Sequence, residues 1–283
     1  MRPKLIISDI DGTMLPEGCG PESPAVRGGI AELRELIARE KLQFTLASGR
    51  PVGMMRPLWE ALGLRLPVVA CNGAAACVPD GSSGFLWNER LDPLCMRPAM
   101  ELADALGMAV IVSDADGGGN EHVYRENDYT RRHAAAGKKW NRVYRPESEA
   151  DWKGYSLQKL LVIDPVSPGK VDAVIEKLRE TEREFPAARP CEVVRYDDRG
   201  VEIMPGNCTK ESGVQRLCAM RSVPLSEVLV CGDNKNDLGM FREAGMSAAV
   251  GNAAEAAKET AGYVCRAEAV FGVLEAVRHF CGS

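Results

Sequence analysis

The fold is decided by the stretch Leu5-Ile6-Ile7-Ser8-Asp9-Ile10-Asp11-Gly12-Thr13, in which a short apolar run ends in two carboxylates and a glycine. The apolar run predicts a buried strand. Open α/β sheets bind ligands at the C-terminal ends of their strands, so both aspartates are expected at such an end. Side chains two residues apart in an extended chain point the same way, so we expect Asp9 and Asp11 to face one reaction centre.

Outward from this stretch, short apolar runs alternate with segments of helical periodicity, and the alternation returns after Pro205. The predicted strands and helices of this kind cover residues 26–37, 42–47, 54–62, 67–71, 211–220, 228–231, 238–244 and 248–250. This alternation is typical of a parallel α/β sheet. Two separate parts of the chain are therefore expected to build one Rossmann-like core.

The segment between these two parts has a different pattern. A hairpin with strands at 75–78 and 85–87 is expected around a turn at 79–84, and residues 117–120 read as a loop. Further strands and helices are predicted at 96–106, 109–112, 157–163, 171–184, 192–195 and 201–204. We predict a discontinuous core of residues 1–81 and 206–283, with an inserted α+β domain over residues 82–205.

Composition narrows the class of protein. The 283 residues are 45% hydrophobic, which is enough for a full core, and the net charge of -5 comes without dense Lys/Arg runs. We therefore expect a small-molecule substrate, no nucleic acid partner, no membrane partner, and a monomer or small homo-oligomer. The ten cysteines show no C-x-x-C spacing, and no signal peptide or membrane span is apparent, so reduced thiols and a cytoplasmic location are expected.

The two aspartates of the opening stretch can divide a phosphoryl transfer between them. Clustered carboxylates repel each other, so one retains a proton more readily unless a cation intervenes. Asp9, ionised and held against Mg²⁺, can attack phosphorus, while protonated Asp11 can donate to the departing alkoxide and later activate water. A polar turn or a calcium-binding loop is the alternative interpretation, but the residues after Thr13 supply no series of calcium ligands.

Three other sites follow predicted strands or begin a predicted helix. Ser48 and Gly49 end the second strand, where a hydroxyl and backbone N–H groups suit phosphate oxygens, although such a pair is commonly only a turn or cap. Lys210 lies where a helix begins, and a cation there opposes the helix dipole, so a phosphate or the Asp9 carboxylate should hold it. The alternative for Lys210 is a solvated surface lysine.

The third strand end, Gly232-Asp233-Asn234-Lys235-Asn236-Asp237, concentrates carboxylates and amides, which are the hard oxygen ligands that Mg²⁺ favours. An Asn/Asp-rich turn that caps the next helix is compatible with this interpretation. Asp237 could cap while Asp233 binds the metal.

These motifs, in this order, resemble those of the haloacid dehalogenase-like (HAD) superfamily, in particular its Cof-type sugar-phosphatase branch. The resemblance covers nearly the whole chain and rests on the Asp9–Thr13 stretch, on Ser48-Gly49-Arg50-Pro51, on Lys210, and on the Gly232–Asp237 segment. Asn72-Gly73-Ala74 and Val250-Gly251-Asn252-Ala253 also look like that branch. Ser48 stands where Thr is frequent, which preserves the hydroxyl.

The resemblance implies a role for each matching residue. Asp9 would be the nucleophile and a metal ligand, Asp11 the acid/base with its carbonyl on Mg²⁺, and Asp233 the remaining protein ligand. Asp237 would orient metal-bound water. The remaining residues would bind the transferring phosphoryl group, namely Ser48, the Gly49 amide, Lys210 and Asn236.

The resemblance implies a Mg²⁺-dependent phosphatase acting on small phosphate monoesters, with sugar phosphates expected, through an aspartyl-phosphate. A hexose phosphomutase and a non-catalytic sugar-phosphate sensor are the alternatives, although Asp11 argues against the sensor. We further hypothesise that the inserted domain is a cap over a catalytic core, and that its polar segment His122–Arg132 helps to recognise the substrate. A solvated, charged helix face is the competing interpretation of that segment.

Overall fold

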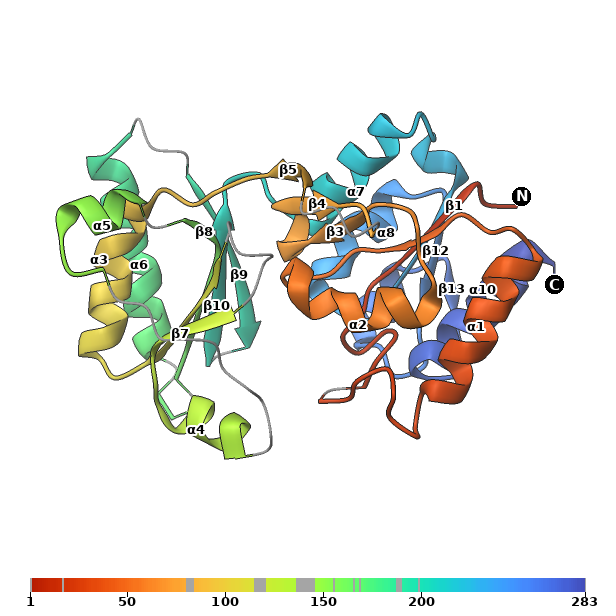
Figure 1. Ribbon diagram of the computed structural model, residues 1–283, viewed down its shortest axis with the longest axis horizontal. Helices are drawn as coiled ribbons and strands as arrows, with labels where there is room; N and C mark the ends of the chain where they lie inside the picture. Colours follow the sequence, from red (N-terminus) through yellow and green to blue (C-terminus); the bar gives the residue numbers. More distant parts are fainter. Residues whose placement is uncertain are drawn as a thin grey trace. The chain divides into compact units, whose positions relative to one another are not determined.

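The computed structural model describes residues 2–16, 18–79, 84–114, 121–135, 146–154, 156–164, 166–167, 169–186, 190–197 and 199–282. They form two compact units (Figure 1): a core unit, Met1–Trp87 with Thr209–Ser283, and an inserted unit, Asn88–Cys208. The boundaries expected from the sequence, 81/82 and 205/206, lie a few residues before these divisions. The function of the inserted unit as a cap stays a prediction.

The core unit is built on a five-stranded sheet in the order β13-β12-β11-β1-β2, and every pair in it is parallel. Its strands are β1 (Leu5–Ser8), β2 (Phe44–Leu46), β11 (Val228–Gly232), β12 (Met246–Ala249) and β13 (Tyr263–Val264). All but the short edge strand β13 are buried throughout, as expected of a parallel sheet covered on both faces. The predicted parallel α/β core is confirmed.

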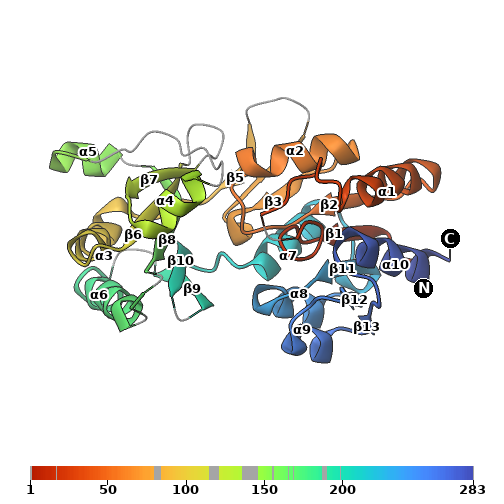
Figure 2. The same ribbon diagram turned by 90° about the horizontal axis from the view of Figure 1, so that it is seen from below.

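The helices of the core unit come from both ends of the chain. They are α1 (Arg27–Arg39), α2 (Val52–Leu62), α7 (Lys210–Met220), α8 (Leu238–Glu243), α9 (Glu255–Thr260) and α10 (Ala269–Cys281), with short 3₁₀ turns η1 (Cys71–Gly73), η2 (Leu225–Glu227) and η3 (Lys235–Asp237). Helix α1 packs against α2 and α10, and α7 packs against α8 (Figure 2). The first and last segments of the chain therefore share one core.

A smaller sheet of the core unit contains β3 (Val68–Ala70), β4 (Ala75–Cys77) and β5 (Phe85–Asn88) in that order. Ala47 and Val69 form a parallel bridge, which aligns β3 with the chain that follows β2. The expected hairpin strands are thus neighbours. Part of the expected turn, residues 80–83, lies outside the described residues.

The inserted unit has an antiparallel sheet in the order β7-β6-β8-β10-β9. Its elements are α3 (Pro93–Ala105), β6 (Ala109–Asp114), β7 (Glu121–Arg125), α4 (Asp128–Ala135), α5 (Glu149–Gly154), β8 (Leu157–Ile163), α6 (Gly169–Glu184), β9 (Cys191–Asp197) and β10 (Gly200–Pro205). Helices α3, α5 and α6 cover one face of the sheet (Figure 1), as expected of an α+β domain. The loop expected at 117–120 lies outside the described residues.

Two features of the whole chain bear on its class. All ten cysteines are free thiols, and most are buried. Within the part of the chain that the structure describes, no helix has the length and apolar character needed to cross a bilayer.

Candidate active site

The site begins where the two central strands of the core sheet end. Strand β1 ends at Ser8 and β11 ends at Gly232, and the register pairs Ser8 with Cys231. Asp9 and Asp233 therefore emerge side by side, and both side chains are buried. The Thr13 hydroxyl lies 2.6 Å from Asp233 Oδ1 and 3.3 Å from Asp9 Oδ2, so it donates mainly to Asp233.

Gly12 makes this approach possible. Its φ of +80° belongs to the left-handed region that favours glycine, and it turns the chain back after the two aspartates. A Cβ at this position would lie 2.2 Å from Asp233 Oδ2. A side chain at position 12 would therefore displace the Asp233 carboxylate.

Lys210 is the first residue of α7 and is only 1% exposed. Thr209 caps this helix through a reciprocal pair of hydrogen bonds with Ser212, which sets where the helix starts. The ammonium of Lys210 lies 2.8 Å from Asp9 Oδ1 and 2.5 Å from Asp237 Oδ1. The negative charges of Asp9 and Asp237 thus offset the unfavourable interaction between the Lys210 cation and the positive N-terminal end of the helix dipole.

The pKa of Lys210 reflects this enclosure. Burial alone would lower it, but the Asp237 and Asp9 carboxylates raise the pKa of Lys210 above its ordinary value. Lys210 is therefore charged at neutral pH.

Asp237, in η3, organises the loop that follows β11. One of its oxygens accepts from the backbone N–H groups of Asp233 and Asn234, at 2.8 and 3.0 Å, while the other receives the Lys210 ammonium. The sequence prediction that Asp237 caps the next helix is wrong: Asp237 directly precedes α8 but makes no side-chain cap to it. Its carboxylate instead closes the loop before η3 and forms an ion pair with Lys210. Asn236, in the same short turn, is half-buried.

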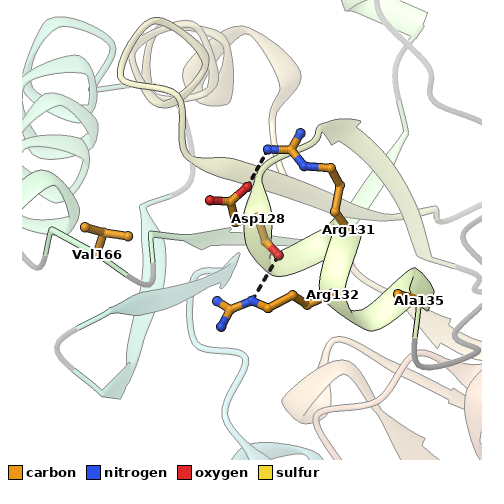
Figure 3. A pocket seen from close by; sticks show the side chains of 5 residues that line it. All are labelled: Asp128, Arg131, Arg132, Ala135 and Val166. Carbon is orange, nitrogen blue, oxygen red and sulfur yellow. Dashed lines mark hydrogen bonds and ion pairs between the residues drawn. The ribbon is translucent and has the colours of Figure 1, made fainter.

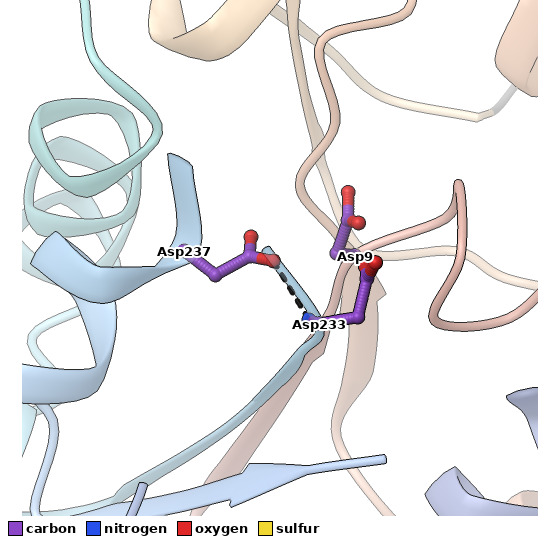
Figure 4. Close-up of side chains that lie close together, drawn as sticks. All are labelled: Asp9, Asp233 and Asp237. Carbon is purple, nitrogen blue, oxygen red and sulfur yellow. Dashed lines mark hydrogen bonds between the residues drawn. The ribbon is translucent and has the colours of Figure 1, made fainter. Parts of the chain in front are cut away.

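Asp9, Asp233 and Asp237 each offer an oxygen, and these atoms lie within 4.8 Å of one another (Figure 4). Burial, the largest cause, raises the pKa of Asp9 and of Asp233, and neighbouring carboxylates raise both further; Lys210 partly opposes the rise. Three buried carboxylates against one lysine leave an excess of negative charge. Because the donors are hard oxygens, the residues fit a divalent cation such as Mg²⁺.

Asp11 has a different environment from Asp9, because the extended chain ends at Ser8 and a turn follows. Its side chain is 53% exposed, and Arg50 holds both of its oxygens: Nη2 lies 2.5 Å from Oδ1 and Nε donates to Oδ2 at 2.8 Å. The Arg50 side chain is itself only 19% exposed. Arg50 belongs to the Ser48-Gly49-Arg50-Pro51 motif, but nothing in the sequence assigned it a role.

Ser48 and Gly49 follow β2, the strand beside β1. The Ser48 side chain is fully buried, and its Oγ accepts from the Arg50 backbone N–H at 3.1 Å. A Cβ on Gly49 would lie 3.2 Å from Asn72 Oδ1, so this glycine leaves room for the Asn72 side chain. Asn72 itself adopts a left-handed conformation, with φ of 48°.

Asn252 is a second residue to which the sequence assigned no role. Its Nδ2 donates to the Gly12 carbonyl at 2.7 Å, and its Oδ1 accepts from the Ala269 N–H at 2.9 Å. Asn252 thus ties the turn after Asp11 to the start of α10. The one signal for Asn252 in the sequence was its position after Gly251, in the Val250-Gly251-Asn252-Ala253 motif that resembles the family.

The chain matches known proteins over nearly its whole length. The model of a family described as haloacid dehalogenase-like hydrolase matches residues 6–277. A 5-amino-6-(5-phospho-D-ribitylamino)uracil phosphatase of Bacillus subtilis is 22% identical over 284 residues, which cover 98% of this chain and 95% of that protein.

Two solved structures share the fold. A Thermotoga maritima protein is 27% identical with a TM-score of 0.74, over 97% of each chain. A protein described as a HAD subclass IIB sugar phosphatase is 20% identical with a TM-score of 0.74, over 98% of each chain. The likeness extends over both units of the fold.

Proposed function

The chain belongs to the haloacid dehalogenase-like hydrolase family, and we propose that it is a magnesium-dependent phosphatase that cleaves small phosphate monoesters through an aspartyl-phosphate. One observation carries the proposal: buried Asp9 contacts Lys210 at the C-terminal end of β1, beside the carboxylates of Asp233 and Asp237. The negative charge of this cluster is balanced only when a further cation binds beside Lys210. A metal cation and a lysine together favour a phosphate ester as the substrate.

In the proposed reaction, Asp9 attacks phosphorus, so that a bond forms between its carboxylate oxygen and phosphorus while the ester O–P bond breaks. Asp11 gives its proton to the departing oxygen. In the second step Asp11 takes a proton from water as that water attacks phosphorus, which releases phosphate and restores Asp9. In the free protein Arg50 holds both oxygens of the Asp11 carboxylate, which is the arrangement of the ionised form that takes the proton from water in the second step.

The bound metal would supply charge neutralisation at the phosphoryl oxygens, and Asp9, Asp233 and the Asp11 carbonyl are the proposed ligands. Lys210, Ser48 and the Gly49 amide would hold the transferring phosphoryl group, with Asn236 nearby. Asp237 would act indirectly, because it holds the loop after β11 and shares the Lys210 ammonium.

The proposed substrates are sugar phosphates. Supporting this, the Bacillus subtilis relative is named for a phosphorylated ribityl compound, and one structural neighbour is described as a sugar phosphatase. In both cases the ester oxygen belongs to a hydroxylated carbon chain. We propose that the inserted unit acts as the cap that selects this leaving group.

The segment His122–Arg132 remains a candidate for substrate recognition within that cap. A pocket of about 480 Å³ is lined by Asp128, Arg131, Arg132, Ala135 and Val166 (Figure 3). Asp128 accepts from Arg131 at 2.6 Å through its side chain and from Arg132 Nε at 3.2 Å through its carbonyl. Alanine at the two arginines should change the ranking of substrates more than the hydrolysis of a small aryl phosphate, and an unchanged ranking would refute this role.

A phosphate-release screen tests the proposed function. Sugar phosphates, nucleotides and phosphorylated cofactors are incubated with Mg²⁺, and free phosphate is measured beside the isomerised ester that a mutase would produce. We expect free phosphate from sugar phosphates, loss of activity with EDTA, and recovery when Mg²⁺ is restored. Isomerisation without phosphate release would favour the mutase, and binding without turnover would favour a sensor.

A further inference from the structure

The inserted unit carries a polar row on the face of its sheet that α3 and α6 do not cover. The row consists of Ser113 on β6, Lys159 on β8 and Glu202 on β10, and these three strands are adjacent in the sheet. Residues that alternate with them, such as Val112, belong to the apolar core beneath the helices. Because side chains alternate along a strand, the row points away from that core.

The sheet register brings the three side chains together. Ser113 pairs directly with Lys159, so their Cβ atoms lie about 5 Å apart on the same face. Glu202 pairs with Leu161, two residues along β8, which makes it the diagonal neighbour of Lys159. The Lys159 ammonium lies 2.8 Å from Glu202 Oε1. The three side chains therefore form one continuous polar cluster on this face of the sheet.

Packing alone does not account for the row. All three residues are buried, and burying a lysine and a glutamate carries a desolvation cost that apolar residues of similar size avoid. The same face of the sheet uses apolar residues, Ile111 and Leu161, at neighbouring positions. Polar residues at 113, 159 and 202 therefore point to binding rather than to stability.

Ser113 supplies an independent observation. Its side chain is only 1% exposed, and its Oγ has no hydrogen-bond partner among the described residues. Buried polar atoms are normally paired, because an unpaired one forfeits its hydrogen bond to water. A hydroxyl in this position can donate to or accept from a ligand that reaches Lys159 beside it.

The chemistry of the row indicates the kind of ligand. Its ionisable side chains are one lysine and one glutamate, which together carry no net charge and so give no preference for an anionic group. A hydroxyl group can accept from Lys159 and donate to Glu202, and it can do either with Ser113. Neutral groups with several hydroxyls satisfy all three residues.

We propose that Ser113, Lys159 and Glu202 bind hydroxyl groups of the substrate's polyol leaving group, and so select sugar phosphates over esters whose leaving group carries a carboxylate. This inference rests on the proposed phosphatase function and specifies its substrate class.

The principal test is Ser113→Ala, with kcat/KM measured for a sugar phosphate and for p-nitrophenyl phosphate, whose leaving group has no aliphatic hydroxyls. We expect the sugar phosphate value to fall roughly tenfold, the size of one lost hydrogen bond, and the aryl phosphate value to stay the same. The melting temperature should be unchanged or higher, because the removed hydroxyl has no partner among the residues that the structure describes.

Thr181→Val is the matched control. Thr181 is an equally buried hydroxyl of the same unit, but it lies on α6 and donates to the Lys177 carbonyl. This variant should leave the ratio of the two kcat/KM values unchanged. A fall in that ratio equal to that of Ser113→Ala would refute a specific role of the row.

A second variant tests the charge argument. Glu202→Gln leaves Lys159 as the row's only ionised side chain, so hydrolysis of phosphoglycolate should rise relative to that of the sugar phosphate. Unchanged rankings in both folded variants would overturn the proposal. Absence of p-nitrophenyl phosphate hydrolysis in the unmodified protein would instead count against the phosphatase function, which separates the two failures.

Discussion

Two ion-paired aspartates, two residues apart in the sequence, lie in opposite environments. Asp9 is buried against Lys210, whose ammonium is shared with Asp237 and sealed from solvent. Asp11 is half exposed and is held by Arg50 at the surface of the same site. The difference follows from the end of β1 at Ser8 and the left-handed turn at Gly12.

The comparison suggests why one motif can perform two kinds of chemistry. A buried carboxylate that is held by a lysine, and that we propose also binds a metal, is fixed in place, as an attacking group must be. An exposed carboxylate exchanges protons readily with water and can meet a leaving group, as an acid/base must.

Loss of the proposed nucleophile should have the largest effect. Asp9→Asn should lower kcat by several orders of magnitude, because no covalent bond to phosphorus can form. Steady-state phosphate release with a sugar phosphate measures the effect, and the folded state is verified by circular dichroism. Activity close to that of the unmodified protein would refute the covalent mechanism.

The exposed aspartate should show a different pattern. Asp11→Asn should also nearly abolish turnover of sugar phosphates, but the loss of the first step should be much smaller for an ester whose leaving group needs no proton, such as p-nitrophenyl phosphate. Rapid-quench measurement of p-nitrophenol release compares the two substrates. Equal losses of the first step for both would remove the distinction between the two aspartates.

Lys210→Met tests the buried side of the comparison. It leaves buried carboxylates without their cation, so the free energy of unfolding should fall by about 3–5 kcal/mol and activity should be severely reduced. Denaturant unfolding in the absence of Mg²⁺ measures the stability change. A stable variant with normal activity would mean that Lys210 neither stabilises the fold nor takes part in the reaction.

Gly12→Ala should move the Asp233 carboxylate, because the added Cβ would overlap its oxygen and because φ at this position is +80°. The Mg²⁺ concentration for half-maximal activity should rise about 10–100-fold. Gly18→Ala is a matched control, since Gly18 also has a positive φ but no atom lies near its added Cβ. An equal effect of both variants would place the cause in backbone strain instead.

The pH dependence of metal binding has a defined sign. The pKa values of Asp9 and Asp233 are raised by burial, so the metal-free folded protein retains protons that the unfolded chain releases. Its stability should therefore fall as the pH rises through this range, and Mg²⁺ should restore it. The rise in melting temperature on adding Mg²⁺ should grow with pH, and a rise independent of pH would contradict the assignment.

The smallest effect on stability is expected at the exposed pair. Arg50→Met should change the free energy of unfolding by no more than about 1 kcal/mol, because the Asp11 side chain is 53% exposed and an ion pair open to solvent contributes little. Its effect should appear in kcat, since Asp11 loses the two hydrogen bonds that orient it. A stability loss as large as that of Lys210→Met would erase the contrast between the two pairs.

There is a physical reason why the sequence predicts that the polar residues at the strand ends lie close together. In a parallel sheet every strand presents its C-terminal end at the same edge, so polar residues after β1, β2 and β11 must converge whatever the exact register. The parallel core and the family were predictable on this basis. Helix α10 was not among the predicted helices but could have been predicted. Its apolar residues recur at helical spacing: Val270, Val273, Leu274 and Val277.

Other features depend on tertiary geometry that no local pattern encodes. The hydrogen bonds from Arg50 to Asp11 require a long side chain that reaches from the end of β2 to the turn after β1. The polar row requires the register between β6, β8 and β10, which are not consecutive in the chain. A serine, a lysine and a glutamate in three separate strands give no sequence signal that they share one face.

A trapped intermediate tests the central claim most directly. The Asp11→Asn variant is mixed with p-nitrophenyl phosphate and Mg²⁺, quenched in acid and digested, because this leaving group needs no proton while hydrolysis of the intermediate needs a base. We expect a phosphoryl group on the peptide that contains Asp9, absent when Asp9 is also changed to Asn. p-Nitrophenol release without any phosphoryl group on that peptide, or with the group on another residue, would contradict it.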